Sequence, residues 1–214
     1  GYIHRDSHDP RGIECALLYR KGVFIPVEVK NIEVEKVSYN KPLRHILYVK
    51  GVVADGGDTL HFFVNHWSSK LGGERESEPH RMASSLKVVS FLDSLANTSS
   101  QGGVPKVIIM GDLNDTPYSK PVNALSLSSL PLKSLSQDAL LTDKGSIKYK
   151  GEWELIDHVI VSQSLGEMMR DIYSPEFLLE EDKSYLSTKP FRSYSGPKYL
   201  GGVSDHLPVI LYKK

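Results

Sequence analysis

Four short apolar runs of this chain adjoin or contain polar residues of the kinds that catalyse reactions or bind metals. This arrangement limits the possible folds more than any other feature of the sequence. The runs and their polar groups are 60–64 followed by Asn65-His66, 107–110 followed by Gly111-Asp112-Leu113-Asn114, 155–161 around Asp157-His158, and 209–212 preceded by Asp205-His206. Their lead polar residues are 46, 45 and 48 residues apart: His66, Asp112, Asp157 and Asp205. Such separations exclude a local loop site. Strands whose ends converge at one edge of a sheet would bring the four groups together.

The rest of the pattern predicts strands separated by turns, with one clear helix. Runs with strand character are 13–19, 23–29, 44–53, 59–65, 106–110, 155–161 and 209–212. Asp55-Gly56-Gly57-Asp58 is a strong hairpin signal. Helical spacing of apolar residues predicts a helix over 79–96, with Pro79 in its first turn and Gly102-Gly103 beyond its end. Residues 121–141 are weakly helical at best and 175–202 read as a long loop, so we expect a mostly β domain with helices outside.

Composition sets limits on the class of protein. The 214 residues, 40% of them hydrophobic, suffice for one domain with a sizeable core. No apolar run approaches the roughly 20 residues that a membrane span needs. The one cysteine, Cys15, excludes an intrachain disulfide and a cysteine-only metal site. Lys plus Arg equals Asp plus Glu at 26 each, which excludes a generally basic coat for nucleic acid.

The zero net charge hides two segments of opposite sign. Residues 151–182 hold nine acidic residues and one basic residue, whereas 183–214 hold six basic residues and one acidic residue. Neighbouring segments of this kind can hold a cation and steer an anion. Two solvated faces of opposite sign are the simpler interpretation.

The chain starts with Gly1-Tyr2-Ile3-His4, which is neither an initiator methionine nor a signal or transit peptide. We therefore expect an interior cut or a processed end. Localisation signals are not visible in these residues, so the compartment is unknown and a secreted or periplasmic location stays open.

Each polar cluster has a structural explanation when it is taken alone. Asn-His can cap a turn, and Gly-Asp-x-Asn is a favourable turn sequence because Asp and Asn bond their own backbone. Asp157 is harder to explain, since an ionised carboxylate inside an apolar strand costs several kcal/mol unless it is paired or metal-bound. Pro208 forbids a regular helix after Asp205-His206. Three acids and two histidines beside strand ends together favour one functional site.

Hydrolysis of a phosphate ester needs residues of these kinds. It requires neutralised charge on the phosphoryl oxygens, a nucleophile made from water and a proton for the leaving oxygen. Oxygen ligands without cysteine suit Mg²⁺, with Mn²⁺ as the alternative, so Asp205 could bind the metal while Asp112 orients or deprotonates water. Asn114 can donate to a phosphoryl oxygen, and a histidine paired with an aspartate can stabilise charge or act as an acid. Zinc held by His66, Asp112 and Asp205 is the rival, but no short-spaced signature such as His-Glu-x-x-His is present.

Together the clusters resemble the endonuclease/exonuclease/phosphatase superfamily, which includes deoxyribonuclease I, abasic-site endonucleases, inositol-polyphosphate phosphatases and neutral sphingomyelinases. The matching motifs run through the whole chain in this order: Asp9-x-Arg11-Gly12, Asn65-His66-Trp67, Gly111-Asp112-Leu113-Asn114, Ile156-Asp157-His158 and Ser204-Asp205-His206. Asp-x-Asn with Ser-Asp-His is specific in combination, whereas either alone is weak. Further motifs resemble a bacterial branch of mostly unassigned substrate: Asn65-His66-Trp67-Ser68-Ser69 with Gly72-Gly73, Gly151-Glu152-Trp153 and Tyr199-Leu200-Gly201-Gly202.

The resemblance implies an α/β fold over the single domain 1–214, a four-layer sandwich of two mixed β-sheets flanked by helices, with the site at one edge. It also implies a role for each matching residue: leaving-group protonation for His66, activation or orientation of water for Asp112, phosphate orientation for Asn114, orientation of the last histidine for Asp157, metal binding for Asp205, and stabilisation of pentavalent phosphorus for His206. Arg11 lies where some members place a phosphate-contacting arginine. Arg192, in the late loop, is a second candidate for substrate binding.

The chain departs from the family pattern at its front. Family members begin with a strand that carries an Asn and, further along, a strand that ends in Gln-Glu, whose Glu is the principal Mg²⁺ ligand. Nothing in 1–50 matches either strand. We therefore expect a domain that lacks its N-terminal strands and half of its metal site.

The leading hypothesis is a Mg²⁺-dependent phosphoester hydrolase in which water attacks in line, without a covalent intermediate, because no Ser or Cys lies beside a base. The substrate would be a phosphodiester or phosphomonoester. Nucleic acid is one candidate, although the acidic 151–182 argues against a duplex nuclease. The alternative is a non-catalytic binding module that keeps the fold. The missing Glu favours that alternative and the intact site residues oppose it; no membrane span and no obligate protein partner are expected.

Overall fold

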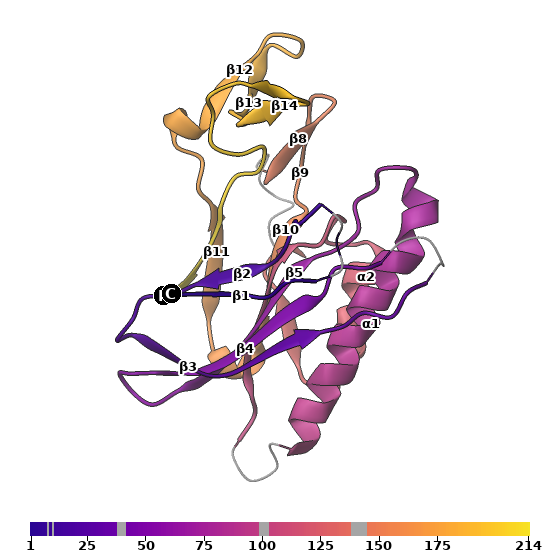
Figure 1. Ribbon diagram of the computed structural model, residues 1–214. Coiled ribbons are helices and arrows are strands. Elements are labelled where there is room, and N and C mark those ends of the chain that lie inside the picture. The colour runs from indigo at the N-terminus through magenta and orange to yellow at the C-terminus, as the bar shows by residue number, and fades with distance from the viewer. Residues whose placement is uncertain (8, 10, 38–41, 99–102, 138–144) are drawn as a thin grey trace.

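A six-stranded mixed sheet forms the centre of the molecule (Figure 1). The computed structural model describes residues 1–7, 9, 11–37, 42–98, 103–137 and 145–214. In sheet order the strands are β3 (Phe24–Ile32), β4 (Ile46–Val53), β5 (Thr59–His66), β6 (Lys106–Asp112), β10 (Asp157–Ser162) and β7 (Leu132–Ser134). β5 and β6 are parallel, and every other neighbouring pair is antiparallel. One end of β5 and β6 therefore lies beside the start of β10.

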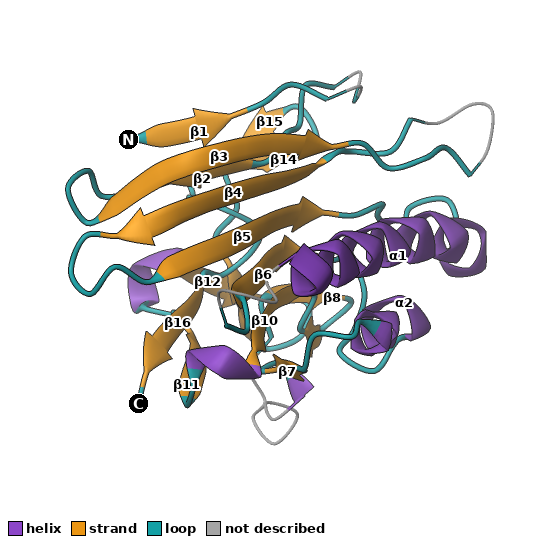
Figure 2. Ribbon diagram, turned by 90° about the horizontal axis from the view of Figure 1, so that it is seen from below, coloured by secondary structure: helices purple, strands orange, loops and turns teal. Residues whose placement is uncertain are grey.

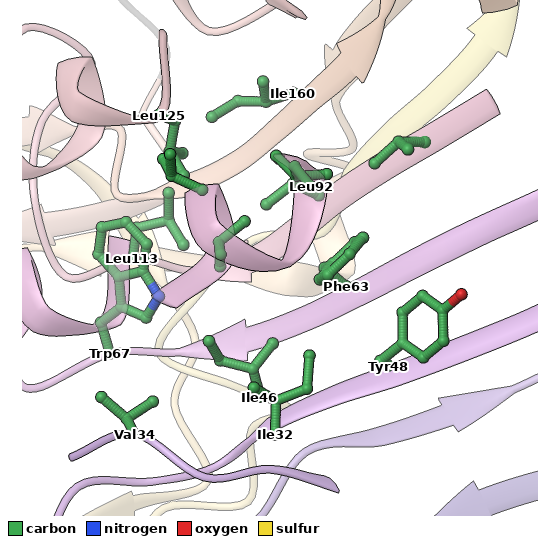
Figure 3. Close-up of a cluster of buried hydrophobic side chains, with 14 of the residues drawn as sticks. Ile32, Val34, Ile46, Tyr48, Phe63, Trp67, Leu92, Leu113, Leu125 and Ile160 are labelled. Atoms are coloured by element: carbon green, nitrogen blue, oxygen red, sulfur yellow. The ribbon is translucent and has the colours of Figure 1, made fainter. Parts of the chain in front are cut away.

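Helix α1 (Glu74–Thr98) connects the parallel strands β5 and β6 and covers one face of the sheet (Figure 2). The short helices α2 (Lys120–Asn123) and η1 (Ala124–Leu127) pack beside it. Alternate residues of the strands point to this face, as the period of two requires. They form with α1 and η1 a buried cluster that includes Tyr48, Phe63, Ile160, Leu92 and Leu125 (Figure 3). None of the helices in the described part of the chain is long and apolar enough to cross a membrane.

The opposite face of the sheet carries two separate two-stranded pieces. One is β1 (Tyr2–His4) with β2 (Ala16–Leu18), and the other is β11 (Met168–Ile172) with β16 (Val209–Lys213). Leu17 packs with the sheet in one cluster and Leu211 in another, and Phe62 contacts both clusters. A groove of about 670 Å³ lies on this face and is lined by Phe62, Val64, Met110 and residues of β16.

A smaller lobe of β-hairpins stands at the end of the sheet where β10 begins (Figure 1). Its strands are β8 (Ile147–Tyr149), β9 (Glu152–Glu154), β12 (Leu179–Asp182), β13 (Ser187–Pro190), β14 (Tyr194–Ser195) and β15 (Lys198–Tyr199). The 3-10 turn Glu176–Leu178 directly precedes β12, whereas the 3-10 turn Gln163–Leu165 follows β10 at the other end of the sheet. Because β9 ends at Glu154 and β10 begins at Asp157, the lobe adjoins the strand end that carries Asp157.

The sequence correctly predicted which central segments are strands and which segment is the long helix. The predicted strands 23–29, 44–53, 59–65, 106–110, 155–161 and 209–212 correspond to β3, β4, β5, β6, β10 and β16. The helix begins at Glu74 rather than 79, so Pro79 lies inside its first turns. Of 13–19 only Ala16–Leu18 is a strand. The predicted 121–141 contains α2 and η1 but also strand β7, and its residues 138–141 lie outside the described part of the chain.

The prediction that 175–202 is a long loop was wrong. The segment forms the antiparallel pairs β12–β13 and β14–β15. Most side chains of these strands are exposed or half-buried, and several are charged, such as Glu180, Glu181 and Lys189. Hairpins held by backbone pairing at the surface lack the apolar alternation on which strand prediction depends.

Gly111 lets the two parallel strands meet at the end of the sheet. Its φ is 122°, and a Cβ added there would lie 2.1 Å from the carbonyl oxygen of Asn65. Only glycine tolerates both this backbone conformation and this close approach. The close approach holds the residue after Asn65 beside the residue after Gly111.

We predict that Gly111→Ala lowers the free energy of unfolding by about 2 kcal/mol or more, because the new methyl group forces β5 and β6 apart. Urea denaturation followed by circular dichroism measures the effect. Gly56→Ala is the matched control, since Gly56 also has a positive φ of 97° but open space around it. Equal losses in the two variants would show that the close approach to Asn65 is unimportant.

Candidate active site

Strand register places three of the predicted site residues in one row. His66 ends β5 and lies directly beside Asp112, which ends β6. Asp112 is in turn paired with Asp157, the first residue of β10. The Nε2 atom of His66 is 3.6 Å from Oδ2 of Asp112. The predicted convergence of separate strand ends is therefore observed for these three residues.

The turn after β6 is held by its own polar groups. The backbone N–H of Asn114 donates to Oδ1 of Asp112 at 2.7 Å, and its side-chain amide donates to Oδ2 of Asp112 at 3.1 Å. The same amide also donates to the carbonyl of Trp67 at 3.0 Å. Asn114 has a φ of 52°, a left-handed conformation that asparagine adopts more readily than most residues. These bonds fix the Asn114 amide beside the Asp112 carboxylate.

His206 joins the row from the far end of the chain. Its Nδ1 is 2.7 Å from Oδ2 of Asp157, and its backbone forms a bridge with Ile147. Burial lowers the pKa of the His206 imidazole, but the hydrogen bond and charge of Asp157 outweigh this, so the pKa is raised. The result favours a cationic imidazole beside the two carboxylates.

The other two members of the row have pKa values displaced in opposite directions. Burial raises the pKa of Asp112 to about 6, and the negative charge of Asp157 adds to the effect. Burial lowers the pKa of His66 to about 4, helped by the positive charges of Arg44 and His206. At neutral pH His66 is therefore neutral, the raised pKa of His206 favours its cationic form, and the Asp112 carboxyl, with a pKa of about 6, can exchange a proton. Environments that separate the pKa values of neighbouring groups are typical of acid–base sites.

Asp205 and Arg192 lie together at the rim of the site. A guanidinium nitrogen of Arg192 is 3.5 Å from Oδ2 of Asp205, and about half of the Asp205 side chain is exposed. Among the described residues, no group of three His, Cys, Asp or Glu side chains converges as a metal would require for full protein ligation. The oxygen donors nevertheless fit a hard cation, since Mg²⁺ takes only one or two carboxylates and keeps several waters.

Arg11 is largely exposed and pairs with Asp9, its Nε and one terminal nitrogen lying 3.2 and 3.1 Å from the two carboxylate oxygens. The side-chain hydrogen bond from Arg11 holds the pKa of Asp9 well below its usual range, although burial opposes it. The charge of Arg11 also contributes to the lowered pKa of His66. Arg11 thus lies close enough to the row to influence it electrostatically.

Arg44 is a site residue that sequence reasoning missed. Its side chain is buried, bonds Asp9 at 2.8 Å and donates to the carbonyls of His66 and Trp67 at 3.3 and 3.0 Å. It therefore ties the loop that carries Arg11 to the end of β5. An arginine just before an apolar strand has no distinctive sequence signal, so nothing in the pattern identified it.

Asp115 and Arg81 support the turn that carries Asp112 and Asn114. Arg81 of α1 is fully buried, and its Nε bonds Oδ2 of Asp115 at 2.7 Å. Lys70 approaches the other carboxylate oxygen at 3.3 Å. Nε2 of His158 contacts the carbonyl of Asp115 at 2.8 Å, so His158 faces away from Asp157 as alternation along β10 requires. The network joins α1, the turn after β6 and β10 behind the row.

A family model described as the Endonuclease/Exonuclease/phosphatase family matches residues 1–214. The chain therefore belongs to the endonuclease/exonuclease/phosphatase family, as the combined motifs indicated. No curated protein matches the sequence.

Solved structures agree on the fold. A protein of the same family from Bacteroides thetaiotaomicron superposes with a TM-score of 0.66 at 16% identity, covering 98% of this chain and 73% of that chain. A mannosyl-6-phosphatase from the same organism superposes with a TM-score of 0.62 at 18% identity, covering 99% of this chain and 76% of that chain. The catalytic domain of human Nocturnin superposes with a TM-score of 0.58 at 19% identity, covering 92% of this chain and 62% of that chain. This chain therefore spans less than two thirds of that domain. The likeness confirms the deoxyribonuclease I-like α/β class, built on a mixed sheet with few helices, and includes bacterial proteins.

We predict that His66 and His206 titrate far apart in ¹H–¹⁵N NMR spectra. At pH 6 His66 should be neutral, because its pKa is about 4, whereas His206 should be protonated, because its pKa lies above the ordinary value near 6.5. Asp157→Asn should lower the pKa of His206, since the hydrogen bond and charge that do most to offset burial are then lost and only the charges of Asp112 and Asp205 still raise it.

Asp58→Asn is the control for this titration, because Asp58 precedes β5 at the end opposite His66 and pairs with Lys106. It should leave both histidines unchanged. A His206 that titrates below His66 in the unmodified chain would contradict the assignment.

Proposed function

We propose that this chain carries the site of a phosphoester hydrolase in which water attacks phosphorus directly. The observation that carries the proposal is the row His66–Asp112–Asp157 joined to His206, with the pKa values of its members displaced in opposite directions. Hydrolysis needs a proton acceptor for water, a proton donor for the leaving oxygen and a positive charge near the phosphoryl group. This row can supply all three at one end of the sheet.

Each side chain would have one role. Asp112, with a pKa near 6, would orient and deprotonate water, since a base works best when its pKa lies near the working pH. Cationic His206, held by Asp157, would stabilise the charge on phosphorus. His66 is neutral at pH 7, and a bound phosphate would raise its pKa enough to protonate the leaving oxygen. The Asn114 amide would exchange one of its present acceptors for a phosphoryl oxygen.

The oxygen donors at the site are of the kind that bind a divalent cation. We propose Mg²⁺, with Mn²⁺ as the alternative, held by Asp205 together with water. When bound, the cation would supply charge neutralisation and a Lewis acid for the phosphoryl oxygens. Binding it would require Asp205 to leave Arg192, which is only 3.5 Å away but exposed to solvent.

The substrate would be a phosphodiester or phosphomonoester, with nucleic acid as one candidate. Arg11 and Arg192 would contact its phosphate from two sides of the row. The structural neighbours support the class, because their names include a mannosyl-6-phosphatase and TDP2 from C. elegans. We also propose that residues 1–214 act as one domain, since the core clusters are built on the two faces of one sheet.

A non-catalytic binding module is the second candidate. The observation in its favour is that no three metal-binding side chains converge within the described ranges. The intact row opposes it, because a site that only binds has no use for a base, a cation and an orienting carboxylate in register.

We predict that the chain hydrolyses bis-para-nitrophenyl phosphate or para-nitrophenyl phosphate in the presence of Mg²⁺, that EDTA stops turnover, and that His206→Ala lowers kcat about 10²-fold or more. Release of nitrophenol, followed by absorbance, measures the rate, and the preferred substrate separates diesterase from monoesterase. His4→Ala, which removes a half-exposed histidine of β1, is the control. Turnover that survives His206→Ala, or that persists in EDTA, would contradict the mechanism. Binding of phosphate esters without any turnover would favour the binding module.

A further inference from the structure

The β8–β9 hairpin is held directly against His206. Ile147 of β8 forms an antiparallel bridge with His206, and the N–H of Leu207 donates to the carbonyl of Ser146 at 2.7 Å. Directly opposite residues of neighbouring strands point to the same face, and so do residues two apart in one strand. Tyr149 therefore shares its face with Ile147 and His206. Its Cα lies roughly 8 Å from that of His206, from the strand spacing and the rise per residue.

The Tyr149 ring is available to a ligand. The ring is 59% exposed, and Nζ of Lys150 lies over one of its faces, 5.3 Å from the centroid. A stacking ligand would therefore use the other face or displace the Lys150 side chain. Lys150 and Gly151 form the tight turn of the hairpin, with φ values of 48° and 89°, as a type I′ turn requires. A Cβ added to Gly151 would meet the ring of Tyr185 at 2.4 Å, so Tyr185 packs on the turn and supports it. The hairpin thus presents a supported aromatic ring with a cation over one of its faces.

A second hairpin, which we call the second arm, precedes His206 in the chain. Residues 191–203 fold back on themselves, with the N–H of Leu200 bonding the carbonyl of Ser193 and that of Val203 bonding Phe191, both at 2.8 Å. At its tip Tyr194 and Tyr199 are a cross-strand pair, 59% and 64% exposed, with ring centroids 5.2 Å apart. Its base carries Arg192, which contacts Asp205 next to His206. Exposed tyrosines therefore stand on both hairpins that join His206.

The charges around the arms limit the size of the ligand. Glu152 lies directly opposite Tyr149, and Glu154 lies opposite Ile147. Residues 151–182 hold nine acidic residues and one basic residue, and the cations on the two arms are few and separate: Lys150 at the hairpin turn, and Arg192 and Lys198 within 191–203. A long polyanion needs cations along its path, because neutralised phosphates dominate its affinity. The surroundings therefore favour a ligand with one phosphate and an uncharged ring over a polynucleotide.

We propose that the two hairpins form a recognition site for a small phosphate ester whose alcohol carries a ring with a flat face, the ring stacking on Tyr149 while its phosphate lies at His206. Tyr194 and Tyr199 would offer the ring a second aromatic surface on the hairpin that carries Arg192. This inference rests on the proposed function, since the phosphate is placed by the row. A nucleobase and the apolar face of a sugar ring share this chemistry, and both stack on tyrosine.

Isothermal titration calorimetry with Ca²⁺ in place of Mg²⁺, to slow hydrolysis, tests the proposal with three esters. Adenosine 5′-monophosphate and mannose 6-phosphate carry rings, and glycerol 3-phosphate does not. We expect at least one ring-bearing ester to bind about tenfold more tightly than glycerol 3-phosphate, the size of a stacking contribution. Tyr149→Ala should remove that advantage and leave the affinity for glycerol 3-phosphate unchanged. Tyr149→Phe should restore it, and Tyr212→Ala, at a half-exposed tyrosine of β16, is the control.

The outcomes separate the recognition site from the proposed function. Tighter binding of the nucleotide identifies a base, and tighter binding of the mannose ester identifies a sugar; either supports the recognition site. Equal affinity for all three esters overturns it and leaves the hydrolase intact. An equal loss for all three in Tyr149→Ala also overturns it, because Tyr149 would then act on the phosphate site. Absence of binding for every ester overturns both proposals.

Discussion

The site depends on two carboxylates, Asp112 and Asp157, held side by side across β6 and β10. Two adjacent partly buried carboxylates repel one another, and the repulsion contributes to the raised pKa of Asp112. The fold compensates from both ends: His206 bonds Asp157, and the Asn114 backbone and amide bond Asp112. Asp112 thereby keeps a pKa of about 6, whereas Asp157 holds the imidazole of His206 in place. This division of labour follows from the strand register, the burial of Asp112 and the hydrogen bonds of His206 and Asn114 together.

The surroundings keep this arrangement rigid. Behind the row, Arg81 of α1 is buried against Asp115, one residue after Asn114. In front of it, Arg44 fixes both the Asp9 loop and the carbonyls after β5. On the face away from α1, the apolar groove of about 670 Å³ reaches Asp157 and His206. Apolar walls lower the local dielectric, which strengthens every charge interaction at the row.

The sequence was sufficient for the parts of the structure that depend on apolar periodicity. Apolar runs located the central strands, and polar residues at their ends located His66, Asp112 and Asp157 as a converging group. It could not reveal Arg44 or Arg81, because their importance comes from tertiary contacts with Asp9 and Asp115 that no local pattern encodes. It also missed the hairpins of 175–202, whose side chains are mostly exposed and whose strands are held by backbone pairing. The roles of all the site residues, including Asp205, Arg11 and Arg192, stay predictions, since the structure shows only where these residues lie.

Titration of inorganic phosphate, followed by ¹H–¹⁵N NMR with Mg²⁺ present, tests most directly whether the row is a phosphate site. The account predicts saturable shifts of the His206 imidazole and the Asn114 side-chain amide, and a rise in the pKa of His66 as phosphate binds. Shifts confined to other parts of the chain, or no saturable shift at the row, would contradict it.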